Sequence, residues 1–317
     1  MKIAIFGNKE STMQLARHLI GNYYNIDALI TLSSEQKELA EISGVNSDLE
    51  RWAIEKEIEI YKPSSYKLNS IEDFEWFHNK KFEIGICLGW QRLIPNNILS
   101  TFSMGVFGWH GSGFEFPNGR GRSPINWSIR LGLGKIYHNF FRYDSDADNG
   151  EIFDTKVIVV KDNDYVSDIQ KMALEHIKNS SLKLIHTASN GSINLRRQSL
   201  QSYISFPKLS EIDGWLQPTL MSVKTAVNIV RSCSRPFPGA YILIINENVK
   251  IRIWRLTLSQ IKEGANLELA VGKMRILSGE ILQIKFLDGV AFSNDFKILS
   301  SSKIFSNERQ YDCESTL

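Results

Sequence analysis

The stretch GVFGWHGSGFEFPNGRGRSPINWSI, residues 105–129, decides how this chain should fold. An apolar run ends on His110, and a loop rich in glycine, with two prolines and two arginines, follows it. An amphipathic segment closes the stretch. The pattern predicts a buried strand that ends on an imidazole, followed by a loop whose glycines let the backbone approach a ligand closely.

On both sides of this stretch, short apolar runs alternate with segments of helical periodicity. Runs rich in Ile and Leu on both faces, separated by helices, are typical of a parallel sheet covered on both sides. We therefore expect an α/β fold, a Rossmann-like doubly wound and mostly parallel sheet. The expected strands are 2–7, 26–32, 57–63, 82–89, 105–110, 137–144 and 152–160, and the expected helices are 11–20 (capped by Ser11), 48–56 and 165–188.

The character of the sequence changes near residue 206. After one more helix, at about 219–233, short strands alternate with turns up to residue 287. Closely spaced strands of this kind favour a small barrel or sandwich. We expect a catalytic domain at 1–205 and an open-barrel-like domain at 206–317.

Composition limits the class of protein. The 317 residues are 43% hydrophobic and 23% charged, as in soluble globular proteins, and a net charge of +2 does not by itself indicate a nucleic-acid binder. Three widely spaced cysteines favour a reducing compartment over a disulfide framework. The first residues resemble neither a signal peptide nor a membrane span. These features predict a cytoplasmic protein.

The candidate site follows from where strands end. The first strand-turn lacks the G-x-G-x-x-G pattern, so a dinucleotide site there is not expected. Doubly wound sheets bind ligands beyond the carboxyl ends of their strands, where residues 90–95, His110 and Asp148 should fall. Asp144, Asp146 and Asp148 lie in one loop, which is interpretable as a solvated acidic turn, a cation loop or a carboxylate partner for His110.

Other candidate chemistry is weaker. The remaining histidines form no metal-ligand pair in the sequence, and no Ser or Cys has a nucleophile-elbow context, so neither a metal site nor covalent catalysis is expected. His18, His78, His176 and His186 are interpreted as ordinary core or surface residues, with His138 only slightly more notable.

The order of four motifs is specific. LGWQRLIP, FGWHGS, GRGRSPINWSI and DADNGEI, in this order, resemble the folate-dependent formyltransferases, which include methionyl-tRNA formyltransferase and enzymes that formylate nucleotide-linked amino sugars. The likeness extends more loosely over residues 1 to about 190, and RPFPGAYI with Trp215 resembles the family's carboxyl-terminal open barrel. The matching positions of the family pattern are His110, Ser112, Arg120, Gly121, Pro124, Asp148 and Gly150.

The resemblance implies a donor and a set of roles. The cofactor would be 10-formyltetrahydrofolate, leaving tetrahydrofolate as product, and the acceptor a primary amine. His110 would transfer the amine proton and stabilise the oxyanion, with Asp148 orienting it. Folate would bind Trp90, Gln91, Arg92, Leu93, Ile94, Tyr143, Asp144, Ser145, Asp146 and Ala147, and the acceptor Gly111, Ser112, Arg120, Arg122 and Pro124.

One position departs from the family pattern. The asparagine two residues before the histidine, which donates to the formyl oxygen, is Gly108 here. Loss of one oxyanion donor typically costs about 3–4 kcal/mol. A backbone N–H, a water, the Trp109 indole or Asn126 are the candidate replacements. A slow enzyme, an enzyme of changed chemistry or a binding protein on the same fold are the alternatives.

The acceptor is inferred from charge. Relatives that formylate tRNA carry a basic insertion after the second strand, whereas residues 33–51 here hold five acidic and two basic side chains. Such a stretch would repel phosphates. Arg120 and Arg122 suit either a pyrophosphate or the acidic loop, and Phe114 and Phe116 either a base or local packing. We therefore expect an amino-sugar N-formyltransferase that binds a nucleotide sugar and neither nucleic acid nor membrane. A homodimer stays open, and a methionyl-tRNA formyltransferase is the alternative.

Overall fold

A computed structural model describes residues 1–39, 44–199, 202–245, 249–258, 269–277, 280–299 and 309–314. Their packing forms two compact units. The first contains Met1–Gly121, Ile136–Ile158 and Lys171–Ser205, and the second contains Arg122–Lys135, Val159–Gln170 and Phe206–Leu317. Two short segments that the sequence assigned to the first domain therefore pack with the second unit. The functional division into 1–205 and 206–317 stays a prediction.

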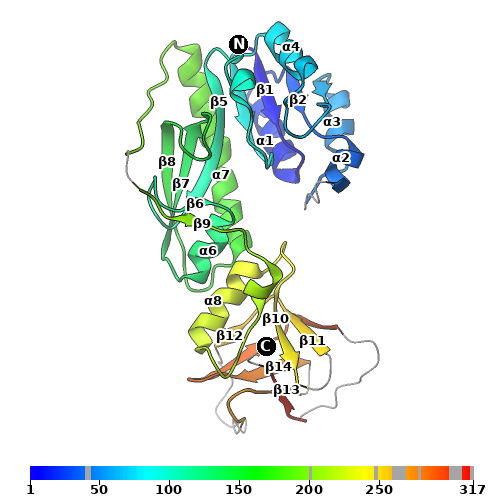
Figure 1. Cartoon of the computed structure of the whole chain (residues 1–317), viewed down its shortest axis with the longest axis vertical. Helices are drawn as coiled ribbons and strands as arrows, with labels where there is room; N and C mark the ends of the chain where they lie inside the picture. The colour runs from blue at the N-terminus through cyan, green and yellow to red at the C-terminus, as the bar shows by residue number, and fades with distance from the viewer. Residues whose placement is uncertain are drawn as a thin grey trace. The chain divides into compact units, whose positions relative to one another are not determined.

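The first unit is built on a seven-stranded sheet of order β3-β2-β1-β4-β5-β7-β8 (Figure 1). The five strands β3 to β5 in this order pair in parallel, which confirms the predicted doubly wound arrangement. Their bounds are β1 (Ile3–Phe6), β2 (Ala28–Ile30), β3 (Glu59–Tyr61), β4 (Ile84–Cys87) and β5 (Gly105–Ser112).

The sheet continues with β7 (Lys135–Arg142) and β8 (Ile152–Val159). β7 runs antiparallel to β5, and His110 lies opposite Asn139 in the register. This pairing extends β5 to Ser112, two residues beyond the predicted end at His110. β4 ends at Cys87, which lies opposite Gly108. His110 is therefore placed just past the level at which the neighbouring strand stops.

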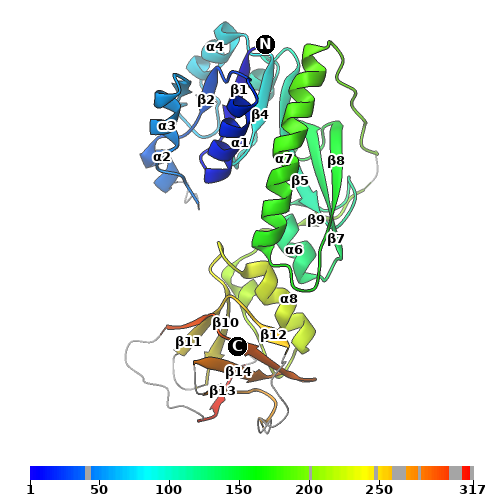
Figure 2. The ribbon, with the colours of Figure 1, turned by 180° about the vertical axis from the view of Figure 1, so that it is seen from behind.

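Helices cover both faces of this sheet, because its strands are apolar on both sides. One face packs on α1 (Glu10–Gly21), α3 (Leu49–Glu55) and α7 (Val166–Ser189), and α7 lies in front of β5, β7 and β8 in Figure 2. The other face packs on α4 (Ile71–Lys80) and α5 (Asn96–Leu99), which the sequence did not predict. The predicted cap of α1 was wrong: the helix begins at Glu10 with Lys9 at the N-cap, and Ser11 lies inside it.

Three further elements are short. α2 (Ser34–Leu39) follows β2, and the small strands β6 (Arg120–Gly121) and β9 (Ser205–Phe206) pair with each other. Among the described residues, no helix is both long enough and apolar enough to cross a bilayer. All three cysteines are free thiols.

The second unit joins two helices to two antiparallel sheets. α6 (Pro124–Arg130) packs on α8 (Val223–Cys233), and the Asn126 amide donates to the Ser232 carbonyl at 2.7 Å. A β-rich carboxyl-terminal region agrees with the prediction, although residues 267 and 268 of its expected LELAVG strand lie outside the described residues. The sheets are β10-β11-β16 and β12-β15-β14-β13-β17, formed by β10 (Ala240–Ile244), β11 (Val249–Ile253), β12 (Thr257–Leu258), β13 (Lys273–Leu277), β14 (Ile281–Lys285), β15 (Val290–Ser293), β16 (Phe296–Leu299) and β17 (Tyr311–Asp312), with a 3-10 turn η1 (Glu211–Gly214).

Candidate active site

His110 is held between two hydrogen-bond acceptors. Its Nδ1 lies 3.4 Å from Asp148 Oδ2, and its Nε2 lies 2.7 Å from the Gly119 carbonyl oxygen. The imidazole is 6% exposed and stacks on Phe116, with ring centroids 5.1 Å apart. Both partners are hydrogen-bond acceptors, so each ring nitrogen faces an atom to which it can donate. The sequence prediction that a carboxylate of the 144–148 loop contacts His110 is confirmed, and the carboxylate is Asp148.

Asp148 has an unusual backbone conformation. Its φ of 56° lies in the left-handed region, which costs a non-glycine residue about 1–3 kcal/mol and is concentrated at functional sites. Its carboxylate also accepts a hydrogen bond from the Gly121 backbone N–H at 3.2 Å. Burial opposes the charged form, but the hydrogen bond and charge of His110 and the Gly121 N–H hold the pKa of Asp148 below its ordinary value. The carboxylate is therefore charged at neutral pH.

Gly108 faces the same side of the sheet as His110, because alternate residues of a strand share a face. A Cβ at this position would lie 2.1 Å from the hydroxyl oxygen of Tyr143 and 2.4 Å from its Cζ. No side chain fits at position 108 while Tyr143 keeps its position. Tyr143 therefore occupies the space that an asparagine side chain at position 108 would need. Trp109 points to the opposite face, where its indole stacks on Phe140 and donates to Ser180 Oγ at 3.4 Å.

The backbone of the loop after β5 comes close to the strand at Gly119. The carbonyl that contacts His110 belongs to Gly119, whose φ is 76° and whose Cβ, if present, would lie 1.9 Å from Ser112 Oγ. Ser112 and Gly111 are buried in β5. Phe116 also packs edge-on against Phe141 at 5.6 Å, so its environment is local packing.

The two arginines have different environments. Arg120 is 5% exposed, and its Nη2 donates to Asn149 Oδ1 at 3.0 Å and to Gln198 Oε1 at 2.7 Å. Its Nε is buried without a hydrogen-bond partner among the described residues. Arg122 is exposed, and Pro124 forms the first residue of α6. Arg120 is thus directed at the end of the 144–150 loop.

The predicted folate-binding residues fall in two segments of the first unit. After β4, Gln91, Arg92 and Leu93 are exposed, whereas Trp90 and Ile94 are buried. Leu93 is 61% exposed despite being apolar, and the Trp90 indole N–H is buried without an acceptor in the described part of the chain. After β7, residues 144–147 are exposed and Tyr143 is half-buried.

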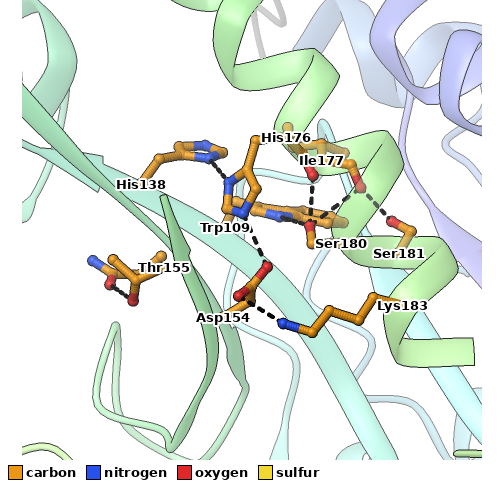
Figure 3. Close-up of polar contacts among 10 residues, drawn as sticks. Trp109, His138, Asp154, Thr155, His176, Ile177, Ser180, Ser181 and Lys183 are labelled. Atoms are coloured by element: carbon orange, nitrogen blue, oxygen red, sulfur yellow. Dashed lines mark hydrogen bonds and ion pairs between the residues drawn. The ribbon is translucent and has the colours of Figure 1, made fainter. Parts of the chain in front are cut away.

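A second polar cluster lies on the opposite face of the sheet, against α7 (Figure 3). His138 Nδ1 lies 2.8 Å from His176 Nδ1, and His176 Nε2 lies 3.3 Å from Asp154, which also pairs with Lys183 at 3.1 Å. Burial lowers the pKa of His138 to about 3 and also lowers that of His176. This pairing could not be predicted from the sequence, because no spacing rule links a strand histidine to one in a helix 38 residues later. No group of three or more potential metal ligands occurs among the described residues.

No protein-family model matches the chain. Methionyl-tRNA formyltransferase of Clostridium perfringens (strain SM101 / Type A) is 22% identical over 307 residues, covering 97% of each chain. Among solved structures, an N-formyltransferase from Helicobacter canadensis, in complex with folinic acid and dTDP-3-aminofucose, matches with a TM-score of 0.63 and 18% identity over 94% of this chain and 100% of that one. HypX from Aquifex aeolicus, in complex with tetrahydrofolic acid, matches with a TM-score of 0.63 and 15% identity; it covers 93% of this chain, which spans only 44% of HypX.

The fold and the candidate site are those of an enzyme-like α/β protein. Its sheet is mostly parallel, its carboxyl-terminal region is β-rich, and a histidine–carboxylate pair lies next to the carboxyl end of a central strand. The sequence relatives and the fold neighbours together support a formyltransferase family for this chain, and they indicate an enzyme.

Proposed function

We propose that this protein transfers a formyl group from 10-formyltetrahydrofolate to the primary amine of a nucleotide-linked amino sugar. The observation that carries the proposal is the His110–Asp148 pair, which lies just beyond the end of β4, the strand that the first predicted folate segment follows. Relatives that match nearly the full chain are formyltransferases, which supports the reaction class.

The site supplies what the proton transfers require. The amine nitrogen attacks the formyl carbon, the bond from that carbon to the folate nitrogen breaks, and one proton moves from the amine to the leaving nitrogen. His110 carries this proton, and Asp148 compensates the charge of the imidazolium. The incoming amine displaces the Gly119 carbonyl as the hydrogen-bond partner of His110 Nε2, because that nitrogen is the one not facing Asp148.

The folate donor fits the residues present. Leu93 offers an exposed apolar side chain, and the Trp90 indole N–H is a buried donor that finds no acceptor among the residues the structure describes. Both belong to the segment after β4, and residues 144–147 add a second exposed segment on the loop that contains Asp148. At a hundredfold excess over its dissociation constant, a reduced folate should therefore raise the free energy of unfolding by about 2.7 kcal/mol. The melting temperature should rise accordingly.

Charge favours the sugar nucleotide over tRNA. Residues 33–51 hold five acidic and two basic side chains, and Glu50 pairs with Lys37 and Lys62 at 2.9 and 2.5 Å, which engages those lysines. Proteins that grip a phosphate backbone rely on free Lys and Arg side chains. A fold neighbour was determined with a dTDP-linked amino sugar, which supports the same acceptor class here.

Methionyl-tRNA is the second candidate acceptor, because the Clostridium perfringens relative that covers 97% of this chain carries that name. The deciding experiment presents a panel of nucleotide-linked amino sugars and initiator methionyl-tRNA separately, each with the formyl donor. His110→Asn protein serves as the matched inactive control. We expect formylation of one or more sugars and none of the tRNA. Formylation of the tRNA alone would overturn the proposed acceptor, and folate binding without any transfer would indicate a binding protein.

A further inference from the structure

The space above Gly108 is filled by a polar atom that belongs to another strand end. Tyr143 follows β7 directly, and its backbone N–H donates to the Val106 carbonyl at 2.7 Å. Its ring packs beside Phe141, with centroids 5.3 Å apart, and brings the hydroxyl within 2.1 Å of where a Cβ of residue 108 would be. The Tyr143 hydroxyl therefore occupies the side-chain site two residues before His110 on the same face of β5.

The present neighbour of this hydroxyl is a weak acceptor. The Tyr143 hydroxyl lies close to the Cys87 thiol, which is buried at the end of β4 opposite Gly108. A thiol sulfur is a poor acceptor, so exchanging it for an anionic oxygen gains hydrogen-bond energy. Burial and the nearby Cys87 and Asp148 also raise the pKa of Tyr143 well above its ordinary value, which keeps the hydroxyl protonated and able to donate.

The other side-chain donors considered for this role are engaged elsewhere. The Trp109 indole lies on the opposite face of the sheet and donates to Ser180. The Asn126 amide belongs to the second unit and donates to the Ser232 carbonyl. Among these candidate side chains, Tyr143 is the one that shares the face of His110.

We propose that the Tyr143 hydroxyl is the hydrogen-bond donor to the formyl oxygen as negative charge develops on it, in the place that Gly108 leaves open. This role rests on the proposed formyl transfer. Donors aimed at such an oxygen act mainly in the transition state, so their loss lowers kcat far more than it raises KM. A tyrosine that served only as packing would not show this division, because its ring would fulfil that purpose without the hydroxyl.

The first test compares one variant with a matched control. Tyr143→Phe removes only the hydroxyl oxygen, and we expect kcat to fall about a hundredfold or more while KM for the folate stays within about threefold. Tyr61→Phe is the control, since that hydroxyl is also hydrogen-bonded, to Asp73 at 2.7 Å, but lies on β3 and outside the site. Its kcat should remain that of the unmodified protein.

A compensating pair separates the donor role from packing. Tyr143→Ala clears the space around residue 108, and adding Gly108→Asn supplies an amide donor there. We expect the double variant to be at least tenfold more active than Tyr143→Ala alone. A Tyr143→Phe kcat within threefold of the unmodified protein, or no rescue by the double variant, would overturn this role. Absence of formyl transfer by the unmodified, folded protein to every amine tested would instead overturn the proposed function itself.

Discussion

Replacing Asp148 with asparagine isolates the charge of the carboxylate next to His110. Asparagine tolerates the left-handed conformation, so the φ of 56° is retained, whereas alanine would add backbone strain. Its amide oxygen also replaces Oδ2 as acceptor for the Gly121 N–H at 3.2 Å. The substitution therefore removes the negative charge and little else.

The magnitude follows from the distance. At the 3.4 Å separation of His110 Nδ1 and Asp148 Oδ2, two unit charges attract by about 5 kcal/mol at an effective dielectric constant of about 20. The Asp148 side chain is 21% exposed, so we use about half this value. About 2.7 kcal/mol in the transition state corresponds to a hundredfold change in rate. We expect kcat of Asp148→Asn to fall about a hundredfold.

The assay is steady-state formyl transfer to the amino sugar identified by the acceptor panel, with melting temperature measured in parallel. Glu57→Gln is the matched control: Glu57 is an exposed acidic residue that also has a positive φ, at 56°, but it lies outside the site. Its kcat should equal that of the unmodified protein. If Asp148→Asn kept more than a third of the activity while folded, the charge of Asp148 would not support His110.

Three further predictions address single residues. His110→Asn should lower turnover at least a hundredfold with the fold intact, as judged by circular dichroism, and an active variant would place the proton transfer elsewhere. Gly108→Asn should give no gain in turnover and should lower the free energy of unfolding by about 1–3 kcal/mol, because its Cβ overlaps the Tyr143 hydroxyl at 2.1 Å; a tenfold gain in turnover would contradict this. Because the pKa of His138 is about 3 in the folded protein and near 6.5 in an unfolded chain, neutral His138 contributes stability that is complete above about pH 6.5 and is lost as the pH falls toward 3. The melting temperature of His138→Gln should therefore depend less on pH between about 6.5 and 4, and equal slopes would exclude His138 as the source.

The fold class could be predicted from the sequence, and so could the contact between His110 and Asp148. Apolar runs with Ile and Leu on both faces, separated by helical segments, require a sheet covered on both sides, and β1 to β5 form it. His110 and Asp148 could be recognised because motif order is a local property of the chain. Where capping depended on one residue, local reasoning was wrong: Lys9, not Ser11, lies at the N-cap of α1.

The tertiary structure decided which side chains face one another. The contact between Gly108 and Tyr143 depends on the antiparallel register of β5 with β7, and no spacing in the sequence states that register. The same register places His138 on the far face of the sheet, where α7 brings His176 within 2.8 Å. Strand pairing and helix packing join residues that are 35 or more positions apart, so side-chain chemistry there is set by the assembled sheet and not by neighbours in the chain.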